Sequence, residues 1–194
     1  MENYFIIRNA IDTKLTNFLY KYFKNKKKVA DYLFTNNFIV PECEWYGTYL
    51  EPAFPTTYAS YSDIAMETLF EEIQKTIEKN INEKLVPTYS YARLYKTGDV
   101  LKKHIDRPEC EISATLNLGG DTWSIYLEPN IEIKLQASDM LVYKGCELAH
   151  WRDTFDGVLC GQVFFHFNSL NNPEVNINKF DGRAFLGLPK FSTL

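Results

Sequence analysis

The sequence predicts a mainly β fold of the sandwich or barrel class, preceded by helices that flank it. Three observations predict this class. Beyond Pro87 the hydrophobic pattern changes from helical to alternating, as expected for short strands with one buried face. Glycine, proline, asparagine or aspartate separates the alternating runs. The chain of 194 residues is 45% hydrophobic and 15% aromatic, which suffices for one sizeable core and would be crowded as two domains.

The first half of the chain is expected to be helical apart from one aromatic segment. Apolar residues at three-four spacing predict an amphipathic helix over residues 12–35. The basic run KNKKK at 24–28 is expected to interrupt it as a solvated helix end or loop, rather than to form a patch for an acidic partner. Residues 38–61, rich in aromatics and prolines, predict a short strand and a long ordered loop. Ser62 can cap a second helix that ends near residues 82–84.

The second half of the chain is expected to form the β core. Alternating runs carry the strand signal, and they cover residues 88–95, 111–118, 123–129, 131–137, 139–145 and 161–167. The tail beyond them is irregular, and the sequence has no internal repeat or low-complexity linker. We therefore expect a single domain, 1–194, in three parts: helical support and an aromatic loop in 1–86, the β core in 87–168, and a C-terminal wrap in 169–194.

Composition argues against several classes of partner. A net charge of -4 and a pI near 5.5 give no overall attraction for nucleic acid or anionic lipid. No apolar run has the length of a membrane span, and the first ten residues lack the features of a signal peptide, so we expect a cytoplasmic protein. In that compartment the cysteines are expected to be buried thiols without disulfides; they are Cys43, Cys110, Cys146 and Cys160.

The residues that carry chemistry are two histidines and an aspartate. His104 and Asp106 are two positions apart, so their side chains leave an extended backbone on the same face. His150 comes after several predicted strands, and a barrel that returns across its own mouth would bring it beside that pair. Two imidazoles and one carboxylate, with positions left open, are typical of a non-haem iron(II) centre. A His-X-Asp pair also arises often by chance, so the surrounding pattern has to support the metal. The remaining histidine, His166, is expected to be a hydrogen-bonded core residue.

That surrounding pattern resembles the iron(II)- and 2-oxoglutarate-dependent dioxygenases, particularly their prolyl hydroxylase branch. The resemblance covers residues 85–167 and consists of Tyr95, a short glycine turn, His104-X-Asp106, a strand, and His150 before a last strand. It implies a double-stranded β-helix, or jelly-roll, barrel braced by the N-terminal helices. It further implies that His104, Asp106 and His150 bind Fe(II), that 2-oxoglutarate is the co-substrate, and that O2 reaches the metal.

The resemblance also suggests co-substrate contacts, with one departure from the family pattern. Tyr95 corresponds to the tyrosine that hydrogen-bonds the co-substrate carboxylate, and Thr115 falls where a second polar contact often occurs. The family has an arginine or lysine about ten residues beyond the distal histidine, whereas this chain is uncharged there. If TFDG at 154–157 is a hairpin turn, Gln162 lies opposite His150 in that place. An amide can hydrogen-bond a dianion but cannot neutralise it.

A nearby positive charge is therefore expected, because a buried carboxylate without a cation is costly. Arg152 is two residues beyond His150 and should face the same interior, so we predict that it supplies the charge with Gln162 assisting. Arg93 alternates in phase with Tyr95 and is the second choice. The plain alternative is that Arg152 is a surface residue on a hairpin, since arginines are usually exposed.

The resemblance implies hydroxylation of a C–H bond, most readily in a peptidyl proline. Retention of Asp106 favours hydroxylation over halogenation, because the related halogenases have a small residue there. A protein or peptide substrate is favoured over a small molecule. A nucleic-acid demethylase would carry a further arginine and a basic face, which this sequence lacks. Two alternatives remain open: a cupin-like metal enzyme that does not use 2-oxoglutarate, and a non-catalytic β-barrel binding module.

Overall fold

Two antiparallel sheets form the body of the molecule, as a computed structural model describes it for residues 3–190. Within those residues, eight strands form the large sheet in the order β1-β10-β7-β12-β5-β4-β3-β2. Their bounds are β1 Tyr4–Ile7, β2 Glu42–Cys43, β3 Gly47–Thr48, β4 Tyr58–Tyr61, β5 Leu85–Lys96, β7 Ile112–Gly120, β10 Met140–Lys144 and β12 Leu159–Ser169. The small sheet, counted over the same part of the chain, has four strands in the order β6-β11-β8-β9. Their bounds are β6 Leu101–His104, β8 Ile125–Leu127, β9 Ile131–Ile133 and β11 His150–Arg152.

From β5 onward the chain passes back and forth between the two sheets. Strands β5, β7, β10 and β12 belong to the large sheet, and β6, the β8 and β9 pair, and β11 come between them in the small sheet. This alternation is the winding of a double-stranded β-helix, and it confirms the predicted jelly-roll barrel with flanking helices. The sheets enclose a space between them, which is where the inward-facing side chains of both meet.

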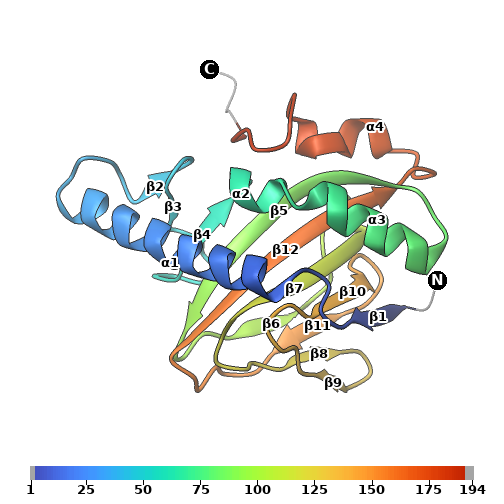
Figure 1. Cartoon of the computed structure of the whole chain (residues 1–194), viewed down its shortest axis with the longest axis horizontal. Coiled ribbons are helices and arrows are strands. Elements are labelled where there is room, and N and C mark those ends of the chain that lie inside the picture. The colour runs from blue at the N-terminus through green and yellow to red at the C-terminus, as the bar shows by residue number, and fades with distance from the viewer. Residues whose placement is uncertain (1–2, 191–194) are drawn as a thin grey trace.

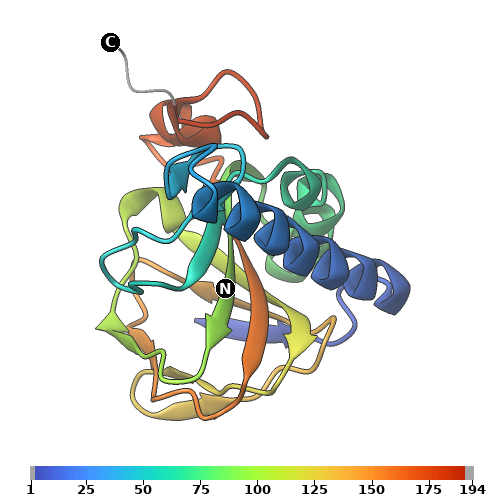
Figure 2. The same ribbon diagram turned by 90° about the vertical axis from the view of Figure 1, so that its left-hand side faces the viewer.

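The three helices of the N-terminal half lie together on the outer face of the large sheet (Figure 1). They are α1 Thr13–Thr35, α2 Ile64–Glu67 and α3 Phe70–Ile81. Phe70 packs edge-on against Phe165 and Phe167 of β12, with ring centroids 5.2 Å apart in each pair. Because side chains alternate along a strand, the neighbours Phe164 and His166 face the opposite way, into the space between the sheets. Seen from the side, the same helices stay on one side of the sheet (Figure 2).

Helix α1 differs from the sequence expectation because the KNKKK run does not interrupt it. The helix continues for 23 residues from its cap at Asp12. Two ion pairs offset the crowded charges: Lys26 pairs with Asp63 across the fold at 2.5 Å, and Lys27 pairs with Asp31 one turn along the same helix at 2.7 Å. The expected solvated helix end or loop was wrong, because Asp63 comes near the run only in the folded chain and Asp31 lies one turn further along the uninterrupted helix.

The second predicted helix is two helices, and its cap is one residue later than expected. Asp63, and not Ser62, accepts the backbone N–H groups of Ala65 and Met66 at the start of α2. Ser62 has a positive φ of 47° and turns the chain out of β4. The chain then bends at Thr68 and Leu69 before α3 begins. Serine and aspartate are both good N-cap residues, so the sequence alone did not decide between Ser62 and Asp63.

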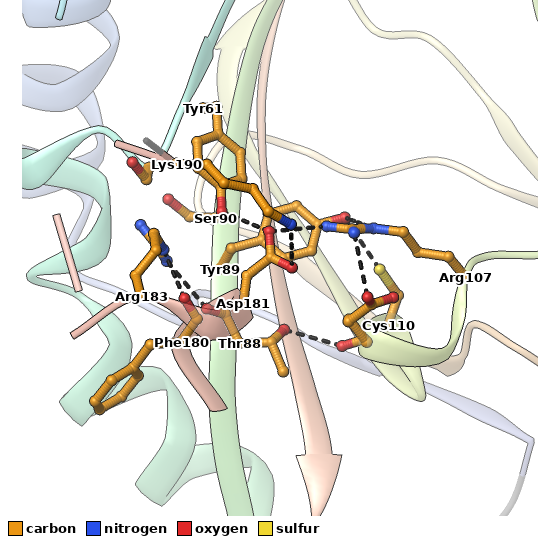
Figure 3. A network of polar contacts seen from close by, with 12 residues as sticks. Tyr61, Thr88, Tyr89, Ser90, Arg107, Cys110, Phe180, Asp181, Arg183 and Lys190 are labelled. Atoms are coloured by element: carbon orange, nitrogen blue, oxygen red, sulfur yellow. Dashed lines mark hydrogen bonds and ion pairs between the residues drawn. The ribbon is translucent and has the colours of Figure 1, made fainter. Parts of the chain in front are cut away.

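The C-terminal segment is tied to the rest of the protein by two buried carboxylates, Glu67 and Asp181; Figure 3 shows Asp181 between Tyr61 and Arg107. It contains the short helices α4 Val175–Asn178 and η2 Lys179–Gly182; η1 Pro108–Cys110 lies earlier, after the small sheet's first strand. Arg183 pairs with Glu67 of α2 at 3.0 Å, and Asp181 accepts hydrogen bonds from Tyr61 at 2.6 Å and Arg107 at 3.1 Å. None of the helices in residues 3–190 is both long and apolar enough to cross a bilayer.

Candidate active site

The structure brings His104, Asp106 and His150 together at the edge of the small sheet. His104 ends β6, His150 begins β11, and the two are directly opposite each other in the antiparallel ladder. One carboxylate oxygen of Asp106, Oδ1, lies 3.6 Å from Nε2 of His104 and 3.5 Å from Nε2 of His150. All of the potential ligand atoms lie within 4.8 Å of one another. Side chains that are 46 positions apart in sequence therefore converge because two strands pair.

Backbone carbonyls fix which nitrogen each imidazole presents. Nδ1 of His104 lies 2.8 Å from the Lys102 carbonyl, and Nδ1 of His150 lies 3.1 Å from the Leu148 carbonyl. A carbonyl can only accept, so Nδ1 carries the proton in both rings and Nε2 keeps its lone pair. Both lone pairs are then available on the side where Asp106 lies. Metal-binding histidines in proteins are commonly held by this kind of contact.

Asp106 is positioned by a polar chain that runs into the core. Ser113 donates to its second oxygen, Oδ2, at 2.7 Å and also contacts Nδ1 of His166 at 3.0 Å. The Asp106 backbone N–H donates to the Gly145 carbonyl at 2.8 Å. A Cβ at Gly145 would collide with Oδ2 of Asp106, so glycine is required at this close approach. One oxygen of Asp106 is thus occupied by Ser113, and the other remains directed at the histidines.

The protonation states of the cluster suit a divalent cation. Burial acts to raise the pKa of Asp106, but the neighbouring His104 and the other imidazoles hold that pKa below its ordinary value. The Asp106 carboxylate, 3.6 Å away, raises the pKa of His104, whereas burial lowers the pKa of His150. An ionised carboxylate with a buried, neutral imidazole is the combination that binds a metal ion. His166 stays apart from the cluster, and burial lowers its pKa to about 4.

A cavity of about 690 Å³ opens beside this cluster. Its volume lies within the usual range of small-molecule sites. It is lined by the inward-facing residues of β5, by both sheets and by a loop from the aromatic segment; the lining residues used below are Glu51, Phe54, Tyr91, Arg93, Tyr95 and Arg152. The cluster and these side chains therefore face one shared space.

Arg152 is buried in the wall of this cavity without a counter-ion. Its side chain is 1% exposed, and its Nη1 donates to the Trp123 carbonyl at 2.6 Å. Its Nε and Nη2 have no hydrogen-bond partner within residues 3–190, and no carboxylate there pairs with it. Burial lowers the pKa of Arg152 from its ordinary value. A buried, unpaired guanidinium is costly, so these two donors fit an anionic ligand.

Arg93 differs from Arg152 because it already has a partner. It faces the same cavity from β5, and its guanidinium forms an ion pair with Glu51 and donates to the Tyr95 hydroxyl at 3.1 Å. Of the two arginines named from the sequence, Arg152 is the one that needs an added anion. The structure also places Arg152 in the interior, so it is not a surface residue on a hairpin.

The other expected co-substrate contacts lie on the inward faces of the large sheet. Tyr95 is fully buried and lines the cavity. Thr115 and Gln162 are buried too, and Thr115 Oγ1 and Gln162 Oε1 have no partner in the described part of the chain. The expected hairpin was wrong: Gln162 pairs in register with Arg93 and Asn117, not with His150. Residues 153–158 instead carry the chain from the small sheet across to the large one.

The sequence did not reveal Ser113, Glu51 or Trp123 as parts of the site. Ser113 is one of many buried serines, and only the fold places it behind Asp106. Glu51 lies in an irregular loop, and its ion-pair partner, Arg93, is 42 positions away in the sequence. Trp123 packs against Tyr95 at a centroid distance of 4.8 Å and carries the Arg152 guanidinium over its ring at 5.0 Å. Inward parity on β7 was the one available signal for Ser113, since it shares a face with Thr115.

Comparison with known proteins supports a fold assignment. No family model matches the sequence, and neither does any curated protein. AviO1 from Streptomyces viridochromogenes has a TM-score of 0.65 at 10% identity, covering 88% of this chain and 91% of that chain. A prolyl-4-hydroxylase from Pseudomonas putida has a TM-score of 0.57 at 14% identity, covering 86% and 92%. HygX from Streptomyces hygroscopicus, solved with nickel, 2-oxoglutarate and hygromycin B bound, has a TM-score of 0.61 at 11% identity, covering 87% and 84%.

The chain has the fold of the 2-oxoglutarate-dependent oxygenases. At these identities the likeness concerns the fold, and the side chains have to make the case for chemistry. In this oxygenase fold the His-Asp-His cluster and the buried arginine lie between the sheets and share one cavity.

Proposed function

We propose that the protein is an iron(II)- and 2-oxoglutarate-dependent oxygenase that hydroxylates a C–H bond. The observation that carries the proposal is the presence, in one cavity, of a His-Asp-His cluster and a buried arginine without a counter-ion. The cluster offers two nitrogen ligands and one carboxylate oxygen, the donor set that iron(II) oxygenases use. The arginine offers two free donors to a carboxylate. A divalent metal and a dicarboxylate together satisfy both groups.

Each residue has a part in this proposal. His104, Asp106 and His150 would hold the metal, and Arg152 would bind the distal carboxylate of 2-oxoglutarate with Tyr95 beside it. Thr115 and Gln162 are secondary contacts. When bound, iron(II), 2-oxoglutarate and O2 supply the oxidation that converts a C–H bond into an alcohol and 2-oxoglutarate into succinate and CO2. The aromatic and aliphatic walls of the cavity exclude water from the reacting groups.

A peptidyl proline is the substrate to test first. The likeness to a prolyl-4-hydroxylase supports it, and the loop that contains Glu51 and Phe54 lines the cavity, where it could contact a peptide. HygX, of comparable likeness, was solved with a small molecule, hygromycin B, so small-molecule acceptors belong in the same screen. A protein or peptide remains our favoured partner.

Turnover of 2-oxoglutarate tests the proposal directly. We expect the wild type to release succinate when supplied with Fe(II), ascorbate and O2, and His104→Ala, Asp106→Ala and His150→Ala to lose this activity. Thermal unfolding with Mn2+, alone and together with 2-oxoglutarate, provides a second measurement, because ligands that bind only the folded state raise its Tm. A rise in Tm with Mn2+ that 2-oxoglutarate does not increase further indicates a cupin-like metal enzyme. No rise in Tm with either ligand indicates a binding module. Equal succinate release by all four proteins would refute the proposal.

A further inference from the structure

A second buried guanidinium, that of Arg93, faces the same cavity and has no part in the proposed chemistry. The side chain is 7% exposed. Nη1 donates to Tyr95, Nη2 pairs with Glu51, and Nε has no partner in residues 3–190. The guanidinium therefore still has a free donor although it is almost fully removed from water. A strand residue that only supports a sheet has no need of such a group in a cavity wall.

Aromatic rings hold this guanidinium in one orientation. Its central carbon lies 4.1 Å from the centroid of the Phe54 ring, 5.0 Å from that of Tyr91 and 5.3 Å from that of Tyr95. Rings around an arginine restrict its rotamers and strengthen its attraction for an anion, since they replace water without neutralising the charge. The group is thus prepared for a planar, two-point contact of the kind a carboxylate makes.

The anion that now occupies this position comes from the chain itself. Glu51 belongs to the loop between β3 and β4, and its side chain is 27% exposed. The Tyr91 hydroxyl donates to the same carboxylate oxygen at 2.7 Å. Arg93 and Tyr91 are fixed on a central strand, whereas their acceptor lies on a partly exposed loop that lines the cavity. A loop carboxylate held this way can be exchanged for another carboxylate without disturbing the sheet.

Space and charge both leave room for such an exchange. The cavity of about 690 Å³ is lined by the metal cluster and by Arg93, and its volume is in the range of sites that hold a drug-sized ligand, so it offers more space than 2-oxoglutarate alone would fill. Arg152 is already assigned to the co-substrate. If Glu51 moves out to solvent, Arg93 is left with one uncompensated positive charge inside the wall. A ligand with a carboxylate restores neutrality there, and a neutral ligand does not.

We propose that Arg93, with Tyr91, binds a carboxylate of the substrate, and that Glu51 takes its place in the unliganded protein. This inference rests on the proposed oxygenase function, because only then is the bound molecule a substrate. It assigns the substrate class: a molecule or peptide with a carboxylate near the carbon that is oxidised. In a peptide this would be an acidic residue beside the target residue. In a small molecule it would be a free acid.

Binding of benzoate, with benzamide as its neutral counterpart, tests the site. Protein saturated with Zn2+, a diamagnetic substitute for the metal, and with 2-oxoglutarate, so that Arg152 is occupied, is titrated with each probe by ligand-observed NMR. We expect weak benzoate binding by the wild type and about tenfold tighter binding by Glu51→Gln, which removes the internal competitor. The double variant Glu51→Gln with Arg93→Gln should lose that gain. It leaves no unpaired charge, so it is the variant least at risk of misfolding. Benzamide should bind equally to all three.

The outcomes separate this inference from the oxygenase proposal. The same titrations without metal or 2-oxoglutarate, in an Arg152→Gln background, report on Arg93 even if the protein binds neither. Benzoate binding that is no tighter in Glu51→Gln, or that survives in the double variant, would overturn the inference. Displacement of benzoate by acetyl-Pro-Glu amide indicates an acidic peptide, and displacement by free L-proline indicates a small acid. Displacement by neither would refute a substrate role for Arg93.

Discussion

Replacing Arg152 with methionine is expected to weaken co-substrate binding strongly. Two of its donors, Nε and Nη2, have no partner in residues 3–190 and are assigned to a carboxylate of 2-oxoglutarate. A hydrogen bond to a charged group contributes ~1.5–3 kcal/mol, so the loss of two costs ~3–6 kcal/mol. The Kd for 2-oxoglutarate should therefore rise by about two to four orders of magnitude.

The same replacement should stabilise the ligand-free protein. Burying an unpaired charge costs several kcal/mol, and methionine removes that cost while keeping much of the volume. Against this, the hydrogen bond to the Trp123 carbonyl, 2.6 Å long, is lost, at a cost of ~1–3 kcal/mol. We expect a net gain of ~1–2 kcal/mol in the free energy of unfolding. For a chain of this length, that gain raises Tm by roughly 2–8 °C.

Two measurements check this pair of opposite effects. Calorimetric titration of 2-oxoglutarate into Mn2+-loaded protein gives the Kd, and scanning calorimetry in EDTA gives the Tm. Arg93→Met is the matched control, because it leaves Glu51 without its cation and should lower Tm. An Arg152→Met protein that binds 2-oxoglutarate within about fivefold of wild type would refute the assignment. A lower Tm would show that Arg152 is structural.

Three further predictions concern Ser113, Glu78 and Phe165. Ser113→Ala should weaken Mn2+ binding about 10- to 100-fold by calorimetry, because Asp106 loses the donor that orients it; unchanged affinity would contradict this. Burial acts to raise the pKa of Glu78, but hydrogen bonds from the Leu85 amide and Lys84 lower that pKa to about 2. The ionised Glu78 carboxylate contributes ~1–2 kcal/mol to the free energy of unfolding; this contribution is complete above about pH 5 and is lost as pH falls towards 2. In urea titrations the free energy of unfolding of Glu78→Gln should therefore fall less than that of the wild type when the pH is lowered. Phe165→Ala should cost ~3–5 kcal/mol in the same assay, since the ring is fully buried against α3, and a cost below ~1 kcal/mol would contradict the packing.

Local patterns predicted the strands and their faces well because alternation along a strand depends only on neighbouring residues. The runs at 88–95 and 161–167 became the central pair β5 and β12, with Tyr95 and Arg93 on the inner face as expected. The spacing of His104 and Asp106 likewise placed both on one side. What brings His150 beside them is a ladder between β6 and β11, and its register was visible in no short stretch of sequence.

The errors came from interactions between distant parts of the chain. TFDG has the composition of a hairpin turn, but its flanking strands pair with different partners in different sheets. The KNKKK run is as highly charged as many solvated loops, but it is helical. Lys26 of this run pairs with Asp63, which is 37 positions away in the sequence. Strand β1, at Tyr4–Ile7, is too short to give a periodic signal and exists because β10 offers it an edge. The ion pair between Glu51 and Arg93 could not be predicted either, because the two residues are 42 positions apart and meet only in the folded chain.

The pairing of His104 with His150 across one ladder means that the ligand cluster reports on the register of the small sheet. A slip of a single residue between β6 and β11 would send one imidazole to the far side of the sheet, and no shared cation could bridge the remainder. Affinity for a divalent ion is then acquired only when these two short strands have found their correct alignment. A bound ion should in turn select that alignment during folding, so metal supply and the yield of native protein become linked quantities.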